Sequence, residues 1–148
     1  MTSVRLRETQ PILMVEDSDD DFDAAKRAFT KANLHNPIVR VKSGEAALAY
    51  LQDETQTWPG IILLDLNMPG LDGRRTLDFI KKDQNLRKIP VIILTTSDDE
   101  RDIQSCYNIG ANTYIQKPVD FNGLIEAIKR LKEYWFEIAL LPKENGNE

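Results

Sequence analysis

The sequence predicts a single α/β domain in which a five-stranded parallel sheet is covered by helices on both faces. Short apolar runs alternate with segments that keep a helical period, and most runs are nearly continuous in Ile, Leu and Val. Continuous apolar strands are typical of parallel sheets with two buried faces, and strands that alternate with helices favour right-handed crossovers. The length of 148 residues suits one such domain.

The first predicted strand is ILMV at residues 12–15, and apolar positions 22, 25, 29 and 32 after it keep a helical period. Asp19 to Asp21 lie where this helix should begin, because acidic side chains stabilise the positive end of a helix dipole. The second strand, at residues 38–41, is followed by a helix whose apolar positions are 47, 48 and 51. These two units open the alternating pattern.

The third strand, at residues 61–64, is followed by a helix marked by Leu77 and Ile80. The fourth, at 91–94, leads to a helix with apolar positions 103, 106 and 107, which Gly110 is well placed to end. The fifth, at 113–115, leads to the cleanest apolar stripe, at positions 121, 124, 125, 128 and 131. We therefore divide the chain into an N-terminal tail (1–10), one domain (11–132), and an extension of the last helix with a C-terminal tail (133–148).

The composition excludes several classes of protein. Hydrophobic residues make up 41% of the chain and charged residues 29%, which argues against disorder. A net charge of −5 without a basic block argues against nucleic-acid binding. No apolar run reaches the roughly 18 residues of a membrane span, and no signal peptide is visible, so we expect a cytoplasmic protein without membrane contact.

Reactive side chains stand at the ends of four predicted strands. Glu16 and Asp17 follow the first strand, and Asp65 follows the third. The fourth run ends at Thr95, and the fifth leads to Lys117. Ligands of open α/β sheets bind beyond the carboxyl ends of the strands, so these side chains should converge on one edge.

Three carboxylates at one edge repel one another. A pair of like charges about 4 Å apart costs roughly 4 kcal/mol at an effective dielectric constant of about 20. One lysine cannot neutralise three acids, but a divalent cation can offset most of the repulsion, and all-oxygen ligands favour Mg²⁺. A carboxylate beside Mg²⁺ and lysine is suited to accept a phosphoryl group.

Residues 11 to about 132 resemble the receiver domain of two-component response regulators. The matching stretches are ILMVEDS at 12–18, ILLDLNMPGLDG at 62–73, IPVIILTTS at 89–97 and GANTYIQKPVD at 110–120. The resemblance implies a flavodoxin-like receiver fold, a doubly wound sheet in strand order 2-1-3-4-5 with five helices. It also implies a phosphoacceptor signalling protein that catalyses only its own phosphorylation and dephosphorylation, with Mg²⁺ as cofactor and a sensor histidine kinase as phosphodonor.

The resemblance assigns roles to the phosphoacceptor and to the residues expected to bind the metal. Asp65 matches the phosphoacceptor. Asp17 matches a direct magnesium ligand, and Glu16 one that acts through water. Asn67 matches the residue whose backbone carbonyl binds the metal. Glu16 departs from the family pattern, because aspartate is common at that position.

Thr95 and Lys117 match the positions that hold the phosphoryl group, and Tyr114 matches an aromatic switch that turns inward when the threonine moves. The bond from Lys117 to Pro118 is often cis in this family, as bonds before proline can be. Asn112 stands where many receivers have aspartate. None of these departures removes an essential group.

The C-terminal segment carries more apolar side chains than one helix face can bury. Tyr134, Trp135, Phe136 and Ile138 follow the last predicted helix. Exposed apolar patches mark interfaces, so these residues are candidates for a homodimer contact; the alternative is that they fold back as a cap on their own domain. This segment, with YLQ before Trp58-Pro59, resembles the small response regulators of cyanobacterial phytochromes, which are dimers.

Three other functions remain as alternatives. A hydrolase of the haloacid dehalogenase type needs an acid two residues after the nucleophile, and Asn67 stands there. A flavodoxin-like electron carrier needs a phosphate-binding loop after the first strand, where residues 16–21 instead carry five acids. A scaffold that works without phosphorylation would not need the acidic site. We therefore predict a single-domain response regulator that signals through altered protein contacts.

Overall fold

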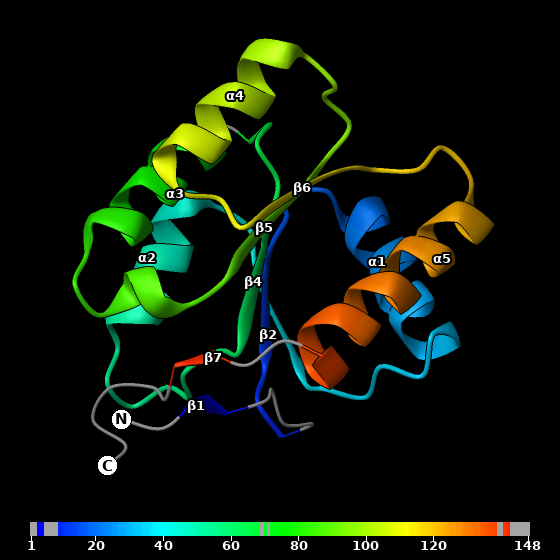
Figure 1. Cartoon of the computed structure of the whole chain (residues 1–148), viewed down its shortest axis with the longest axis horizontal. Coiled ribbons are helices and arrows are strands. Elements are labelled where there is room, and N and C mark those ends of the chain that lie inside the picture. Colours follow the sequence, from blue (N-terminus) through cyan, green and yellow to red (C-terminus); the bar gives the residue numbers. More distant parts are fainter. Residues whose placement is uncertain (1–2, 5–8, 69, 71, 139–140, 143–148) are drawn as a thin grey trace.

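The structure is a computed structural model that describes residues 3–4, 9–68, 70, 72–138 and 141–142. Its centre is a five-stranded parallel sheet in the order β3-β2-β4-β5-β6 (Figure 1). Counted along the chain, these five strands follow the order 2-1-3-4-5, which confirms the predicted topology. Their bounds are β2 (Ile12–Val15), β3 (Ile38–Val41), β4 (Ile61–Leu64), β5 (Val91–Thr95) and β6 (Thr113–Gln116).

Helices cover both faces of the sheet. Two lie together on one face and three on the other (Figure 1). The first pair is α1 (Asp19–Lys31) and α5 (Phe121–Lys132); the second group is α2 (Gly44–Gln52), α3 (Gly73–Lys82) and α4 (Glu100–Ile109), with a short 3₁₀ turn η1 (Leu86–Lys88) after α3. All five predicted helices are therefore confirmed.

Local chemistry explains where these helices begin and end. Ser18 Oγ accepts a hydrogen bond from the Asp21 backbone N–H at the start of α1, and Ser43 Oγ accepts one from Ala46 at the start of α2. Such caps satisfy N–H groups that have no partner inside the helix. Gly110 ends α4 at φ 128°, a backbone conformation that favours glycine.

The sheet separates two apolar clusters. Alternate residues of β2 belong to opposite clusters: Leu13 and Val15 pack toward α2 and α3, whereas Ile12 and Met14 pack toward α1 and α5. Every residue of β2, β4 and β5 is buried. The residues of β3 and β6 are half-buried, or exposed in the case of Gln116, because these strands form the sheet edges. Continuous apolar sequence in the three central strands follows from this double burial.

The last helix continues into a π-helical segment, η2 (Glu133–Ile138). Trp135 is buried against the α1–α5 cluster, Phe136 packs against the same cluster, and Tyr134 is 52% exposed. Trp135 therefore belongs to the core of its own chain, as the capping alternative predicts, whereas Tyr134 faces outward. The Ile138 side chain lies outside the described part of the structure.

The two predicted tails contribute a feature that the sequence does not predict. Ser3–Val4 (β1) and Leu141–Pro142 (β7) pair as a short antiparallel ribbon. Strands of two residues carry no periodic signal, so no pattern in the sequence indicates them. Within the described residues, no helix is long and apolar enough to cross a bilayer.

Candidate functional site

Strand register brings the predicted site residues to one edge of the sheet. Val15 pairs with Leu64, so Glu16 and Asp65 each follow directly on neighbouring strands. The Asp65 backbone N–H donates to the Val15 carbonyl at 3.2 Å, which fixes the start of the loop after β4. At the other side, the Lys117 N–H donates to the Thr95 carbonyl at 2.6 Å.

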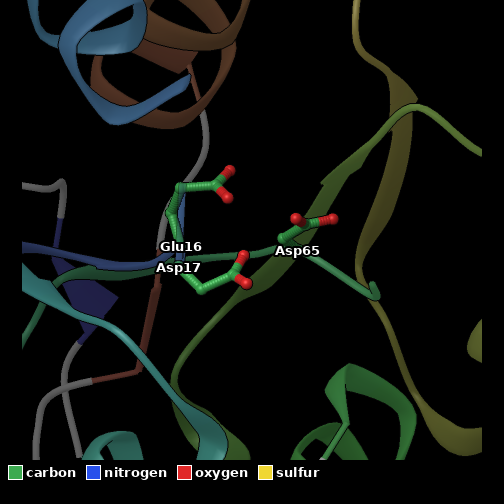
Figure 2. Close-up of side chains that lie close together, drawn as sticks. All are labelled: Glu16, Asp17 and Asp65. Carbon is green, nitrogen blue, oxygen red and sulfur yellow. The ribbon is translucent and has the colours of Figure 1, made fainter. Parts of the chain in front are cut away.

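Glu16, Asp17 and Asp65 form a cluster of carboxylates (Figure 2). One oxygen from each lies within 4.8 Å of the other two. Glu16 is 1% exposed and Asp65 is 8% exposed, while Asp17 is open to solvent. Charges this close, two of them shielded from water, repel strongly unless a cation lies among them.

Lys117 supplies one such cation. Its ammonium lies 2.7 Å from Glu16 Oε1, 3.1 Å from Asp21 Oδ2 and 3.7 Å from Asp65 Oδ2. The sequence predicts Asp21 only as a charge at the start of a helix. In the structure, Asp21 lies in the first turn of α1 and its carboxylate contacts Lys117 at the sheet edge. No spacing rule in the sequence indicates that contact.

Burial and charge act in opposite directions on this pair. Burial raises the pKa of Glu16, and the hydrogen bond and charge of Lys117 offset only part of that effect. Burial disfavours the charged form of Lys117, but the Glu16 hydrogen bond and the charge of Asp65 outweigh it and raise the pKa of the lysine. Lys117 is thus held as a cation between two acids.

Thr95 and Asn67 complete the inner part of the site. Thr95 is fully buried, and its Oγ1 accepts a hydrogen bond of 3.5 Å from the Asn67 side-chain amide. The Asn67 backbone N–H donates to Asp65 Oδ1 at 3.3 Å. Asn67 therefore connects the carboxylate of β4 with the hydroxyl of β5.

A second hydrogen-bond network begins at Tyr114. Its hydroxyl donates to the Ser97 carbonyl at 2.9 Å, and Ser97 Oγ donates to Asp102 Oδ2 at 2.7 Å. Arg74 on α3 donates to Asp102 through Nε at 3.0 Å and also through Nη2. The Ser97 hydrogen bond, followed by that of Arg74, lowers the pKa of Asp102. No sequence pattern indicates the Arg74–Asp102 contact, because it joins two helices through side chains 28 positions apart.

Gly73 sets the position of the loop after β4. A Cβ atom on this residue would lie 2.6 Å from the Leu66 Cα and would also meet the Asp65 carbonyl oxygen. Any side chain larger than hydrogen would therefore displace the backbone that carries Asp65.

The bond from Lys117 to Pro118 is trans, since the described residues contain no cis peptide. This corrects the cis geometry that the resemblance suggests. Trans is favoured before proline by about 0.5–1 kcal/mol unless the fold selects cis.

The donor set fits Mg²⁺. One ammonium beside three carboxylates, and shared with Asp21, leaves at least two negative charges uncompensated, and every candidate ligand is a hard oxygen donor. Asp17, Asp65 and Glu16 are the side chains that would hold the ion. Zinc normally takes nitrogen or sulfur ligands, and this group offers none.

The chain is similar to known signalling proteins along most of its length. The sequence model of one family, described as the response regulator receiver domain, matches residues 12–129. The response regulator Rcp1 of Synechocystis sp. (strain ATCC 27184 / PCC 6803 / Kazusa) is 35% identical over 135 residues, which cover 88% of this chain and 92% of that protein. The probable methanogenesis regulatory protein FilR2 of Methanothrix harundinacea (strain 6Ac) is 37% identical and covers 84% of this chain and 82% of its own.

Solved structures agree with the fold. The phosphorylated cyanobacterial phytochrome response regulator RcpA superposes with a TM-score of 0.84 at 36% identity, over 91% of this chain and 99% of that one. A Mn²⁺-bound form of Rcp1 superposes with a TM-score of 0.82 at 34% identity, over 90% and 99% of the two chains.

Proposed function

The chain belongs to the response regulator receiver domain family, and from that premise we propose that Asp65 accepts a phosphoryl group from a sensor histidine kinase in a Mg²⁺-dependent reaction. The observation that supports this most is the placement of Lys117. Its ammonium lies between the buried Glu16 and the Asp65 carboxylate. From there it can neutralise negative charge on the oxygens of a phosphoryl group that is transferred to Asp65. Family membership also argues against the hydrolase and electron-carrier alternatives.

The proposed transfer forms one bond and breaks another. An Asp65 oxygen attacks phosphorus, a P–O bond forms, and the P–N bond to the kinase histidine breaks. Lys117 neutralises charge on the phosphoryl oxygens, and the Thr95 hydroxyl donates to one of them. Mg²⁺, when bound, supplies further neutralisation of those oxygens.

The output of the proposed reaction is a change in protein contacts. Phosphorylation would shift an equilibrium between two surface states, with Thr95 and Tyr114 as the switch pair. Tyr114 already reaches the loop after β5 through Ser97, so movement of that loop would alter the surface around α4. We propose no enzymatic activity on other substrates.

The relatives suggest partners. RcpA is a phytochrome response regulator by its description, which makes a phytochrome the leading candidate for the kinase, whereas FilR2 is described by methanogenesis regulation. We propose a cytoplasmic protein that forms a homodimer through the exposed part of η2 around Tyr134, with the partly buried Phe136 beside it, and that contacts neither nucleic acid nor membrane.

Acetyl phosphate with Mg²⁺ tests the proposal without knowledge of the kinase. Intact-mass spectrometry should find one added phosphoryl group on the parent protein and none on Asp65→Asn. Asp20→Asn is the matched control, because it removes an exposed aspartate of α1 and should be phosphorylated like the parent. Absence of uptake by the parent protein at millimolar Mg²⁺ would remove the proposed function.

Metal binding is tested separately by thermal unfolding. Mg²⁺ binds the folded state and relieves carboxylate repulsion, so at about ten times its Kd it should stabilise the protein by about 1.4 kcal/mol. Asp17→Asn should lose most of this increase, and Asp20→Asn should keep it. An unchanged melting temperature in the parent protein would count against the metal site.

A further inference from the structure

Arg40, on edge strand β3, contacts both ends of the loop that carries Glu16 and Asp17. Its Nε donates to the Glu16 backbone carbonyl at 3.0 Å, and its Nη1 lies 2.7 Å from Asp19 Oδ1. Glu16 directly follows β2, and Asp19 begins α1. The guanidinium therefore bridges the two anchor points between which the loop runs.

The guanidinium is itself held firmly. Its carbon lies 4.9 Å from the centre of the Phe22 ring, and the Arg40 side chain is 15% exposed. Its third nitrogen, Nη2, is buried and has no hydrogen-bond partner among the described residues. Such a group is oriented by its two hydrogen bonds and by the ring beneath it, so the loop ends cannot move without breaking a charge-assisted contact.

We propose that Arg40 is a positioning residue that fixes the Glu16–Asp17 loop in its metal-binding arrangement without touching the metal or the phosphoryl group. The inference rests on the proposed function, because it concerns the same carboxylate cluster. Side chains that orient metal ligands from behind typically change metal affinity by about 10–100-fold when they are removed.

A positioning role and a purely electrostatic effect of Arg40 predict opposite changes in Mg²⁺ affinity when the side chain is replaced. Arg40 is a cation near a site for a cation, so loss of its charge alone should make Mg²⁺ bind more tightly. Loss of the Arg40 contacts with Glu16 and Asp19 should make Mg²⁺ bind more weakly, because part of the binding free energy is then needed to order the loop. The direction of the change in Kd therefore decides between the two effects.

The test is isothermal titration of Mg²⁺ into the full chain. Arg40→Met should raise the Kd about tenfold, with thermal unfolding in EDTA showing that the variant is folded at the titration temperature. Arg27→Met is the matched control: Arg27 also stacks on a ring, Phe121 at 5.1 Å, and pairs with Asp23, but it does not reach the loop. The Kd of this control for Mg²⁺ should stay within about a factor of two of the parent value.

Two aspartate variants provide a second route if Arg40→Met does not fold. Asp19→Asn removes the distal anchor, and Asp20→Asn removes the same charge from the next residue, for which the described structure has no ion pair. Asp19→Asn should bind Mg²⁺ more weakly than Asp20→Asn. Both side chains are exposed, so neither change endangers folding.

The outcomes separate the inference from the proposed function. If the parent binds Mg²⁺ while Arg40→Met binds it equally or more tightly, or Asp19→Asn and Asp20→Asn bind it alike, the positioning role is overturned and the proposed function stands. If the parent protein itself binds no Mg²⁺, both are overturned.

Discussion

The Lys117 ammonium lies 2.7 Å from the Glu16 carboxylate, although the two residues are 101 positions apart in the chain. Glu16 is 1% exposed, so its charge is shielded from water and depends on this contact. The same ammonium reaches toward Asp65 at 3.7 Å. One lysine therefore stabilises the carboxylate cluster and lies beside the proposed phosphoacceptor.

Lys117→Met should destabilise the folded protein as well as impair phosphorylation. Removal of one partner from a buried ion pair typically lowers the free energy of unfolding by about 3 kcal/mol, because the other charge is left unpaired. Urea unfolding at neutral pH measures this loss. Lys129→Met, which breaks an exposed pair with Glu126, should change it by less than about 1 kcal/mol. Equal losses in the two variants would show that Lys117 has no special structural role.

Gly73→Ala should slow phosphorylation from acetyl phosphate. The added methyl group would meet the Leu66 Cα at 2.6 Å and displace the backbone of Asp65. A displacement of about 1 Å in a reacting group can lower a rate by about a hundredfold. Gly123→Ala is the control: its new methyl group would meet the end of the Asp120 side chain, which can rotate away, and Pro118 Cβ at 3.0 Å, but no backbone atom of the loop that carries Asp65. A parent-like rate in Gly73→Ala would contradict the role given to this close approach.

Trp135 and Tyr134, although adjacent, should respond differently to truncation. Trp135→Ala should lower the free energy of unfolding by about 3–5 kcal/mol, because its side chain is buried in the α1–α5 cluster. Tyr134→Ala should change it by less than about 1 kcal/mol but should weaken self-association, measured by sedimentation velocity. A Tyr134→Ala protein that associates like the parent would argue against the proposed dimer contact.

Asn112→Asp should remove a pH dependence that comes from Lys81. The Lys81 ammonium donates to the Arg87 and Ile89 carbonyls and to Asn112 Oδ1, which are all neutral acceptors. Burial lowers the pKa of Lys81 from 10.5 to about 8. Between these values the unfolded chain holds a proton that the folded chain has released, so stability should rise with pH across that window.

A carboxylate at position 112 would raise the pKa of Lys81 and flatten this slope. It should also stabilise the protein near neutral pH by about 1 kcal/mol, because the lysine would gain a charged partner. Urea unfolding from neutral pH up to the top of that window measures both effects, with Lys81→Met as the variant that lacks the titrating group. An identical slope in the parent protein and in Lys81→Met would contradict this explanation.

The sequence predicts the sheet and its helices well because their signals are local. Continuous apolar strands such as 61–64 and the stripe of α5 need no tertiary information. The convergence of Glu16, Asp65 and Lys117 also follows from a general rule about strand ends. The contacts of Asp21, Arg40 and Arg74 could not be predicted, because each depends on side-chain directions across elements that lie far apart in sequence.

In the C-terminal segment, spacing is more informative than composition. Trp135 lies four positions after Leu131, so it continues the apolar stripe of α5, and it is buried. Tyr134 lies outside that stripe and is 52% exposed. The excess of apolar residues predicts a patch, but the helical period is what separates these two neighbours.

The central claim is that the Asp65 carboxylate itself becomes phosphorylated. After reaction with acetyl phosphate and Mg²⁺, borohydride reduces an acyl phosphate to homoserine, and peptide mass spectrometry then locates the reduced residue. We predict homoserine at position 65 alone, formed only when Mg²⁺ was present. Label at another carboxylate, or the same yield at position 65 with EDTA, would contradict the account.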